Sequence, residues 1–147
     1  NPLALGAGLL EGSGYGKNMQ AMLLTRGLTE MIQFGKAVGA SSYSFLGTAG
    51  IGDLIATANS QTSRNFSFGY RLGQGEKFDD IWNSFTELAE GVRTLRIMNR
   101  LAQQLNIFIP INQMLYKIVF EDHSIDSAIR LLMAFPFDLE VEQDAQW

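Results

Sequence analysis

Helical periodicity runs through almost the entire chain, whereas the alternation typical of β-strands is almost absent. From about 18 to 38, apolar side chains recur at helical spacing and polar side chains fill the remaining positions. The apolar positions are Leu24, Leu28, Met31, Ile32, Phe34, Ala37 and Val38, and the polar positions are Arg26, Glu30, Gln33 and Lys36. The pattern predicts a long amphipathic helix that is closed by Gly39, Ser41 and Ser42. A chain patterned in this way is predicted to be all-α.

The rest of the chain predicts a series of shorter helices. The glycines Gly47, Gly50 and Gly52 indicate a bent approach to a short helix within 48–59, with Asp53 in its first turn. Further helices are expected at Ser63–Leu72, Phe78–Phe85, Glu90–Leu105, Pro110–Val119 and Ser124–Met133, with Ser63 and Ser124 as N-caps, Pro110 at a helix start and Pro136 as a stop. The helix at 90–105 should bury a stripe of Val92, Leu95, Ile97, Met98, Leu101, Ala102 and Leu105.

Length and composition favour one globular domain. A chain of 147 residues with 46% hydrophobic residues can bury a sizeable core. No internal repeat and no low-complexity linker divides the sequence, so residues 1–147 are expected to form a single all-helical domain. The acidic segment Asp138–Trp147 shows no clear period, and we expect it to be a loosely held tail.

Charge and residue usage exclude several classes of function. A net charge of -4 gives no electrostatic reason for binding nucleic acid or anionic lipid. The absence of cysteine excludes disulfides and thiolate chemistry, and the longest apolar runs fall far short of about 20 residues, so no transmembrane helix is expected. The first eight residues have neither an initiator methionine nor a basic region, so they resemble the middle of a longer chain rather than a signal peptide.

Two short motifs predict a site for a small phosphorylated polyol. The first, Gly50–Leu54, contains Asp53, whose carboxylate can accept hydrogen bonds from sugar-like hydroxyls. The second, Ser63-Arg64-Asn65, offers a guanidinium that can bind phosphate in bidentate fashion, together with a hydroxyl and an amide. Its expected place at a helix N-terminus also favours an anion. Taken alone, Asp53 could be an ordinary first-turn aspartate, and Ser63-Arg64-Asn65 could be a helix cap with a surface charge. The occurrence of both motifs in one chain favours a ligand-binding site.

Other motifs are better explained by structure than by chemistry. The stretch 12–18 is not a phosphate loop, because Glu11 and Asn18 stand where glycine and Ser or Thr are required, so its glycines should instead permit left-handed turns between helices. Gly6-Ala7-Gly8 lacks the third glycine of a dinucleotide fingerprint and should allow close helix packing. His123, the only histidine, is expected to be a solvated loop residue without metal-ligand partners.

Several blocks in the same order resemble the C-terminal half of the NAD(P)-dependent glycerol-3-phosphate dehydrogenase family of bacterial type. The resemblance runs from Asn1 to about Ala134. The matching blocks are 18–31 (NMQAMLLTRGLTEM), 47–54 (GTAGIGDL), Ser63-Arg64-Asn65, 87–94 (ELAEGVRT) and Ile109-Pro110-Ile111 with Tyr116.

The resemblance implies a helical substrate-binding domain, similar to the C-terminal domain of 6-phosphogluconate dehydrogenase-like enzymes, that follows an N-terminal Rossmann domain. It implies that Asp53 binds the glycerol hydroxyls, that Asn1 lies close to the substrate, and that three consecutive residues hold it: Ser63, Arg64 and Asn65. It further implies that the dinucleotide is contacted by Arg64, Leu88 and Glu90.

The family's catalytic lysine would directly precede Asn1, so it is not in this chain. Oxidation of the carbinol requires removal of a hydroxyl proton as hydride leaves, which is the role of that lysine. Lys17 is not expected to replace it, because it lies in a glycine-rich turn. The chain alone is therefore expected to be inactive.

As a whole, the protein is expected to be a cytoplasmic oxidoreductase that interconverts sn-glycerol 3-phosphate and dihydroxyacetone phosphate with NAD or NADP and feeds phospholipid biosynthesis. Neither the choice between NAD and NADP nor the formation of a homodimer is fixed by the sequence. Two alternatives stay open: the helical domain of another Rossmann-linked dehydrogenase for small acids, and a non-enzymatic helical interaction module. No metal cofactor is expected.

Overall fold

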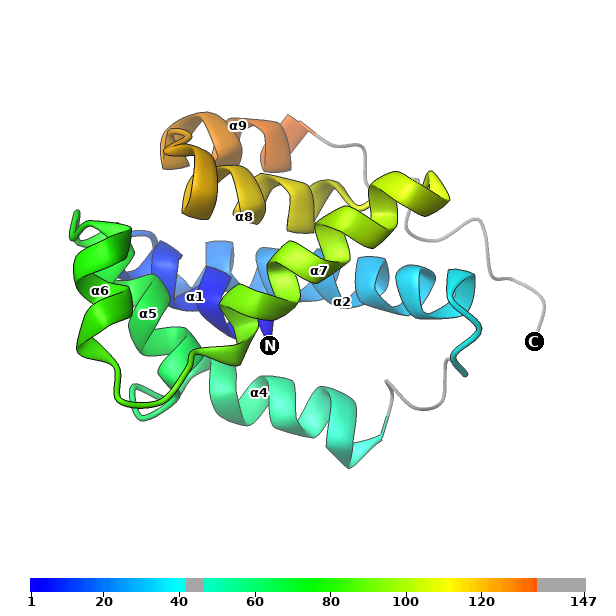
Figure 1. Ribbon diagram of the computed structural model, residues 1–147, viewed down its shortest axis with the longest axis horizontal. Helices are drawn as coiled ribbons and strands as arrows, with labels where there is room; N and C mark the ends of the chain where they lie inside the picture. The colour runs from blue at the N-terminus through cyan, green and yellow to red at the C-terminus, as the bar shows by residue number, and fades with distance from the viewer. Residues whose placement is uncertain (42–46, 135–147) are drawn as a thin grey trace.

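The computed structural model describes residues 1–41 and 47–134, and the elements found in these ranges are helices, without a strand (Figure 1). In chain order they are α1 (Pro2–Gly12), α2 (Lys17–Ala37), a π-helix η1 (Thr48–Gly52), α4 (Asp53–Ala58), α5 (Arg64–Gly73), α6 (Phe78–Ser84), α7 (Glu90–Leu105), α8 (Pro110–Glu121) and α9 (Ile125–Ala134). The all-α prediction is confirmed.

The predicted helix boundaries agree closely with the observed ones. Ser63 caps α5 through its side chain, which accepts a hydrogen bond from the backbone N–H of Phe66. Pro110 is the first residue of α8, and Asp53 lies in the first turn of α4. The bent approach before α4 is the π-helix η1, which the glycine-rich sequence did not specify. The predicted stop at Pro136 and the predicted tail at 138–147 lie outside the described residues.

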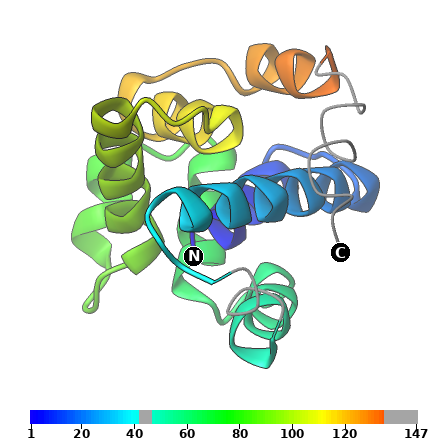
Figure 2. The same cartoon turned by 90° about the vertical axis from the view of Figure 1, so that its right-hand side faces the viewer.

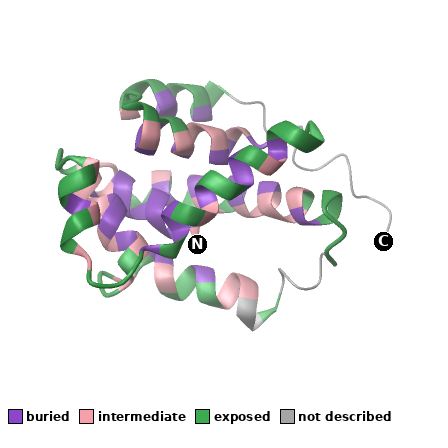
Figure 3. Ribbon diagram, in the orientation of Figure 1, coloured by how far each residue is buried: buried purple, intermediate pink, exposed green. Residues whose placement is uncertain are grey.

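Helix α1 forms the centre of the molecule. Every residue from Pro2 to Leu10 is buried, and Figure 3 shows the buried residues gathered on α1 and on the faces that surround it. Because α1 is surrounded by other helices, it has no polar face, and its sequence shows little amphipathic periodicity. This is why the sequence suggested a helix here without giving its limits.

Helices α1 and α5 pack with almost no space between their backbones. A Cβ atom on Gly69 would lie 1.9 Å from the carbonyl oxygen of Leu5, and one on Gly73 would lie 2.4 Å from that of Leu9. The expected close packing at Gly6-Ala7-Gly8 is confirmed, since a Cβ atom on Gly8 would lie 2.0 Å from a backbone oxygen of α5. Residue numbers rise together along both helices at these contacts, so the helices run parallel and begin at the same end of the bundle.

Two polar residues of α2 correct the prediction that they lie on a solvent-exposed face. Arg26 and Glu30 are only 6% and 4% exposed. Arg26 donates a hydrogen bond to the carbonyl oxygen of Leu132 in α9, and Glu30 accepts hydrogen bonds from the first turn of α8. Both side chains are buried because α8 packs over α2 and Leu132 of α9 reaches Arg26, and the hydrogen bonds there offset much of the cost of burying them.

Helix α7 corrects a second prediction. Val92, Leu95, Met98 and Ala102 are buried as expected, but the side chains of Ile97 and Leu105 are about half exposed. Ile97 lies two residues, or about 200° around the helix, from Leu95 and so faces outward. Leu105 is the last residue of the helix. The buried stripe is therefore narrower than predicted.

Candidate functional site

The N-terminal ends of three helices meet beside α4. Asn1 is the N-cap of α1, where its side-chain oxygen accepts from the N–H of Ala4 at 3.2 Å. Its side-chain nitrogen donates to the hydroxyl of Thr57 in α4 at 3.0 Å. Figures 1 and 2 place the start of the chain between α4 and the beginning of α7. Asn1 therefore links the central helix to the helix that carries Asp53.

Asn65 and Gly91 join the start of α5 to the start of α7. The side-chain oxygen of Asn65 accepts a hydrogen bond from the N–H of Gly91 at 2.7 Å. A Cβ atom on Gly91 would lie 2.7 Å from that oxygen and 2.8 Å from the carbonyl oxygen of Asn1, so these three residues are in close contact. The oxygen of the Asn65 amide is committed to Gly91, which leaves its NH₂ group as the donor available to a ligand.

Arg64 is the first residue of α5, directly after the Ser63 cap. Its guanidinium forms an ion pair with Glu87, which lies in the segment before α7, and the two side chains are 51% and 72% exposed. The positive end of the α5 dipole and the guanidinium act in the same direction, so this position favours an anion.

The carboxylates of Asp53 in α4 and Glu90 in α7 both lie near the backbone nitrogen of Asn1. Both are close enough to this nitrogen to act on it electrostatically. Since such an effect requires proximity, both carboxylates lie near the start of α1. Asp53 is exposed and lies one turn before Thr57, the partner of Asn1.

The segment 88–90 alternates between exposed and buried side chains. Leu88 is 47% exposed and Glu90 is exposed, whereas Ala89 between them is buried. An exposed leucine next to an exposed carboxylate can contact an apolar ring and accept hydrogen bonds from ribose hydroxyls. These two side chains are therefore chemically suited to a ligand that carries both an apolar ring and sugar hydroxyls.

The groups gathered here are chemically suited to a small molecule that combines a phosphate with hydroxyl groups. Arg64 and the helix N-termini supply positive charge, and Asp53 supplies an acceptor for hydroxyls. The structure brings Asn1, Asn65 and Glu90 together, with Asp53 facing the same end of α1 and with Arg64 next to Asn65.

Lys17 lies at the other end of α1. The helix of 11 residues is about 16 Å long, and Lys17 follows its C-terminus and pairs with Glu11 at 3.1 Å. This location agrees with the expectation that Lys17 does not act as a base at the site.

The stretch 12–18 was expected to form left-handed turns at its glycines. The turn at Gly14 is confirmed by its φ of 85°, whereas Gly12 packs within α1 and Gly16 caps α2 with a negative φ.

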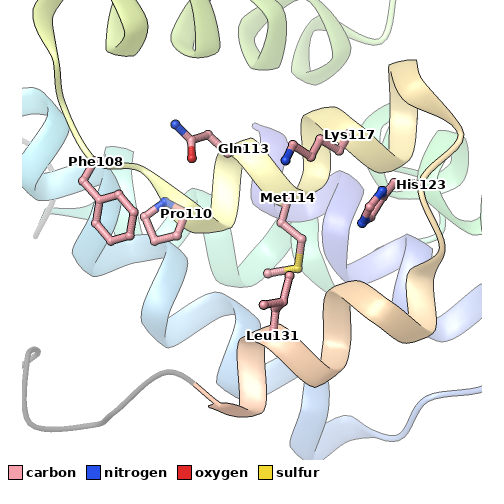
Figure 4. A pocket seen from close by; sticks show the side chains of 7 residues that line it. All are labelled: Phe108, Pro110, Gln113, Met114, Lys117, His123 and Leu131. Carbon is pink, nitrogen blue, oxygen red and sulfur yellow. The ribbon is translucent and has the colours of Figure 1, made fainter.

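His123 is exposed, as expected, and lies at a pocket between α8 and α9 (Figure 4). This pocket has a volume of about 170 Å³ and is lined by Phe108, Pro110, Gln113, Met114, Lys117, His123 and Leu131.

Within residues 1–41 and 47–134, no group of three His, Asp or Glu side chains is placed to hold a metal ion. No helix in the same part of the chain is both long and apolar enough to cross a membrane.

Three residues of the site were not identified from the sequence. Thr57 and Glu87 are ordinary polar residues on short elements, and no local pattern marks them. Gly91 gave a usable signal, because a glycine in the first turn of a predicted helix indicates close approach of another backbone or side chain.

Comparison with known proteins gives consistent matches. The sequence model of the family described as NAD-dependent glycerol-3-phosphate dehydrogenase C-terminus matches residues 1–130. The chain is 42% identical over 133 residues to glycerol-3-phosphate dehydrogenase [NAD(P)+] of Staphylococcus haemolyticus and 45% identical over 134 residues to that of Geobacillus thermodenitrificans. These alignments cover 90% and 91% of this chain but 40% and 39% of the relatives, so the chain spans about two fifths of their length.

Solved structures agree with the sequence comparison. The crystal structure of glycerol-3-phosphate dehydrogenase from Coxiella burnetii superposes with a TM-score of 0.85 at 32% identity, covering 91% of this chain and 41% of that one. The enzyme from Saccharomyces cerevisiae superposes with a TM-score of 0.79 at 23% identity, covering 89% of this chain and 39% of that one, and supports the fold alone.

Proposed function

The chain belongs to the family of C-terminal domains of NAD-dependent glycerol-3-phosphate dehydrogenases, and on this basis we propose that the whole protein interconverts sn-glycerol 3-phosphate and dihydroxyacetone phosphate with NAD or NADP. Residues 1–147 would be its helical substrate-binding domain, which closes against an N-terminal Rossmann domain. The single observation that carries the proposal is the contact of Asn1 with both Thr57 and Gly91, because it brings the helix of Asp53 next to the helices of Arg64 and Glu90.

Each residue of the site has a distinct role in this proposal. Arg64 binds the phosphate, and the Ser63 hydroxyl and the Asn65 amide complete its shell. Asp53 accepts hydrogen bonds from the glycerol hydroxyls and so orients the carbon to be oxidised. Asn1 lies next to the substrate and fixes the position of α4 through Thr57.

The residues present also fit the cofactor side of the reaction. Arg64, Leu88 and Glu90 would contact the dinucleotide, which when bound supplies the hydride acceptor. The hydroxyl proton of the substrate must leave together with the hydride, and the family resemblance assigns its removal to a lysine directly before the position of Asn1.

The proposal predicts that Arg64→Ala in the full-length protein lowers kcat/KM for glycerol 3-phosphate by about 30- to 700-fold, equivalent to about 2–4 kcal/mol. The cause is the loss of charge-assisted hydrogen bonds to the phosphate. Steady-state kinetics with glycerol 3-phosphate varied at saturating NAD or NADP would measure the effect.

Arg100→Ala is the matched control, because Arg100 is an exposed arginine ten residues beyond the start of α7. It should leave kcat/KM within about twofold of wild type, as expected of an exposed residue outside the site. Equal kcat/KM values for Arg64→Ala and wild type would contradict the phosphate-binding role of Arg64.

Three wider assignments belong to the same proposal. The chemistry of the substrate pair, which supplies the glycerol phosphate backbone of lipids, supports a role in phospholipid biosynthesis and a cytoplasmic location. The assignment of the chain to one domain is supported, within residues 1–41 and 47–134, by the main hydrophobic cluster, which draws buried residues from α1, α2 and α5 as well as from α7, α8 and α9. Formation of a homodimer stays a prediction.

A further inference from the structure

The ion pair between Arg64 and Glu87 occupies the group that the proposed function assigns to phosphate binding. Glu87 approaches Arg64 from the segment before α7, and both side chains are more than half exposed. The carboxylate of Glu87 therefore takes the place at the guanidinium that a phosphate oxygen would need.

The segment before α7 is attached to α5 through Glu87, and the first turn of α7, which follows directly, is attached to α5 at a second, neighbouring point. The second attachment is the hydrogen bond from the N–H of Gly91 to Asn65 at 2.7 Å, and Gly91 is buried. This contact does not depend on Glu87. The segment can consequently keep its position when Arg64 exchanges its partner.

Resting on the function proposed above, we propose that Glu87 is an internal counter-ion of Arg64 that a phosphate-bearing ligand displaces, so that Glu87 determines how tightly the site binds such ligands. A phosphate carries more negative charge than a carboxylate and presents three oxygens to the guanidinium, so it can replace Glu87. Once displaced, Glu87 stays close to the phosphate as a like charge, which weakens binding further.

The carboxylates around the site make this exchange important. Glu87 places a negative charge directly beside Arg64, and two further carboxylates, Asp53 and Glu90, lie near the start of α1. Removal of the charge of Glu87 should therefore strengthen phosphate binding. An exposed ion pair of this kind corresponds to a change of about 1.4- to 5-fold in a binding constant.

A different role for Glu87 predicts the opposite sign. If Glu87 served to hold Arg64 in its productive orientation, loss of the carboxylate would weaken ligand binding. The direction of the effect thus separates a competitor from a positioning residue.

The test is the variant Glu87→Gln in the full-length protein, alone and combined with Arg64→Ala. The quantity is kcat/KM, measured at ligand concentrations far below KM so that saturation is not required. One series varies glycerol 3-phosphate and a second varies the dinucleotide, which distinguishes the substrate phosphate from the cofactor pyrophosphate as the displacing group. Glu76→Gln is the matched control, because Glu76 forms a partly exposed ion pair with Arg71 in the last turn of α5.

The proposal expects Glu87→Gln to raise kcat/KM by about 1.4- to 5-fold in at least one series. In the Arg64→Ala background, Glu87→Gln should leave kcat/KM unchanged. The control Glu76→Gln should have the kcat/KM of wild type. An unchanged or lower kcat/KM for Glu87→Gln, with Arg64→Ala strongly impaired, would overturn this inference and leave the proposed function intact. An equal gain in both backgrounds would overturn it as well, because it would reflect general electrostatics rather than exchange at Arg64. An unimpaired Arg64→Ala would instead contradict the phosphate-binding role of Arg64 in the proposed function.

Discussion

At the scale of single residues, Gly91 is constrained by two neighbours within the candidate site. A methyl group added there would lie 2.7 Å from the Asn65 side-chain oxygen and 2.8 Å from the Asn1 carbonyl oxygen. We expect Gly91→Ala to push α7 away from α5 and to lower kcat/KM for glycerol 3-phosphate by about tenfold or more, because small displacements of binding groups strongly reduce rates. Steady-state kinetics of the full-length variant would measure this.

Gly16→Ala provides the comparison for Gly91→Ala. A Cβ atom on Gly16 would meet nothing within 4 Å, and the backbone there has a φ of -78°, which any residue adopts. This variant should keep the kcat/KM of wild type. Equal activity of the two variants would show that the contact at Gly91 does not matter for the site.

Glu30 predicts a pH dependence of stability. Burial raises its pKa from 4.5 to about 7, against the opposing effect of hydrogen bonds from Asn112 and Ile111. The folded state then binds more protons than the unfolded state between these values, so Glu30 contributes stability below pH 4.5 that is lost as pH rises through 7. The change is about 3 kcal/mol for a shift of this size.

Urea unfolding at pH 5 and pH 8 would measure this contribution. Because other carboxylates also titrate, the informative quantity is the difference between wild type and Glu30→Gln, which has no ionisable group at this position. The free energy of unfolding of wild type should fall more between the two pH values than that of the variant. Parallel changes in the two proteins would contradict the assignment.

The residue scale also shows what a sequence can predict about a site. Asp53 and Ser63-Arg64-Asn65 were predicted as site residues because charged residues occur next to a helix start or a cap, which are local features, and their ligand-binding roles stay a prediction. Arg26 and Glu30 were misplaced because their burial depends on α8 and α9, more than 80 residues away in the chain. Glu87 was missed as a site residue for the same reason, since its partner is on another helix.

At the scale of elements, the parallel packing of α1 on α5 positions the site. Contacts between Leu5 and Gly69 and between Leu9 and Gly73 have the same offset, and continuing it toward the helix starts places Asn1 next to Asn65. Gly69→Ala would place a Cβ atom 1.9 Å from a backbone oxygen that belongs to a buried helix. We expect it to lower the free energy of unfolding by about 2–4 kcal/mol, as overpacking at a rigid contact does.

Ser67→Ala on the same helix is the control for Gly69→Ala, because Ser67 is only partly buried and the substitution adds no atom. Its free energy of unfolding should lie within about 0.5 kcal/mol of wild type. Chemical denaturation of both variants would test the difference. A Gly69→Ala protein as stable as wild type would mean that the two helices can separate without cost.

How well the limits of each helix could be predicted depended on whether the helix has one buried face and one solvated face. Helix α7 was predicted with its observed limits because one face is buried and the other is solvated, and α8 was marked at its start by proline. Helix α1 lacked such a pattern because it is buried on all sides. The π-helix η1 was not predicted, since the glycines at 47, 50 and 52 indicate a bend but not its hydrogen-bond pattern.

At the scale of the whole molecule, the chain corresponds to one part of its longer relatives. It spans about two fifths of the length of its curated relatives, and its candidate site is built around Asn1. The inactivity of residues 1–147 alone follows from the proposed roles of the Rossmann domain and the lysine, and stays a prediction. What this chain supplies in the account is a phosphate-binding arginine and a hydroxyl-binding aspartate on neighbouring helices.

The most direct test is a crystal structure of the full-length protein with glycerol 3-phosphate bound. The account predicts the phosphate in contact with the Arg64 guanidinium, a glycerol hydroxyl within hydrogen-bond distance of the Asp53 carboxylate, and Glu87 separated from Arg64. A phosphate bound away from Arg64, or Arg64 and Asp53 on opposite sides of the domain, would contradict the central claim.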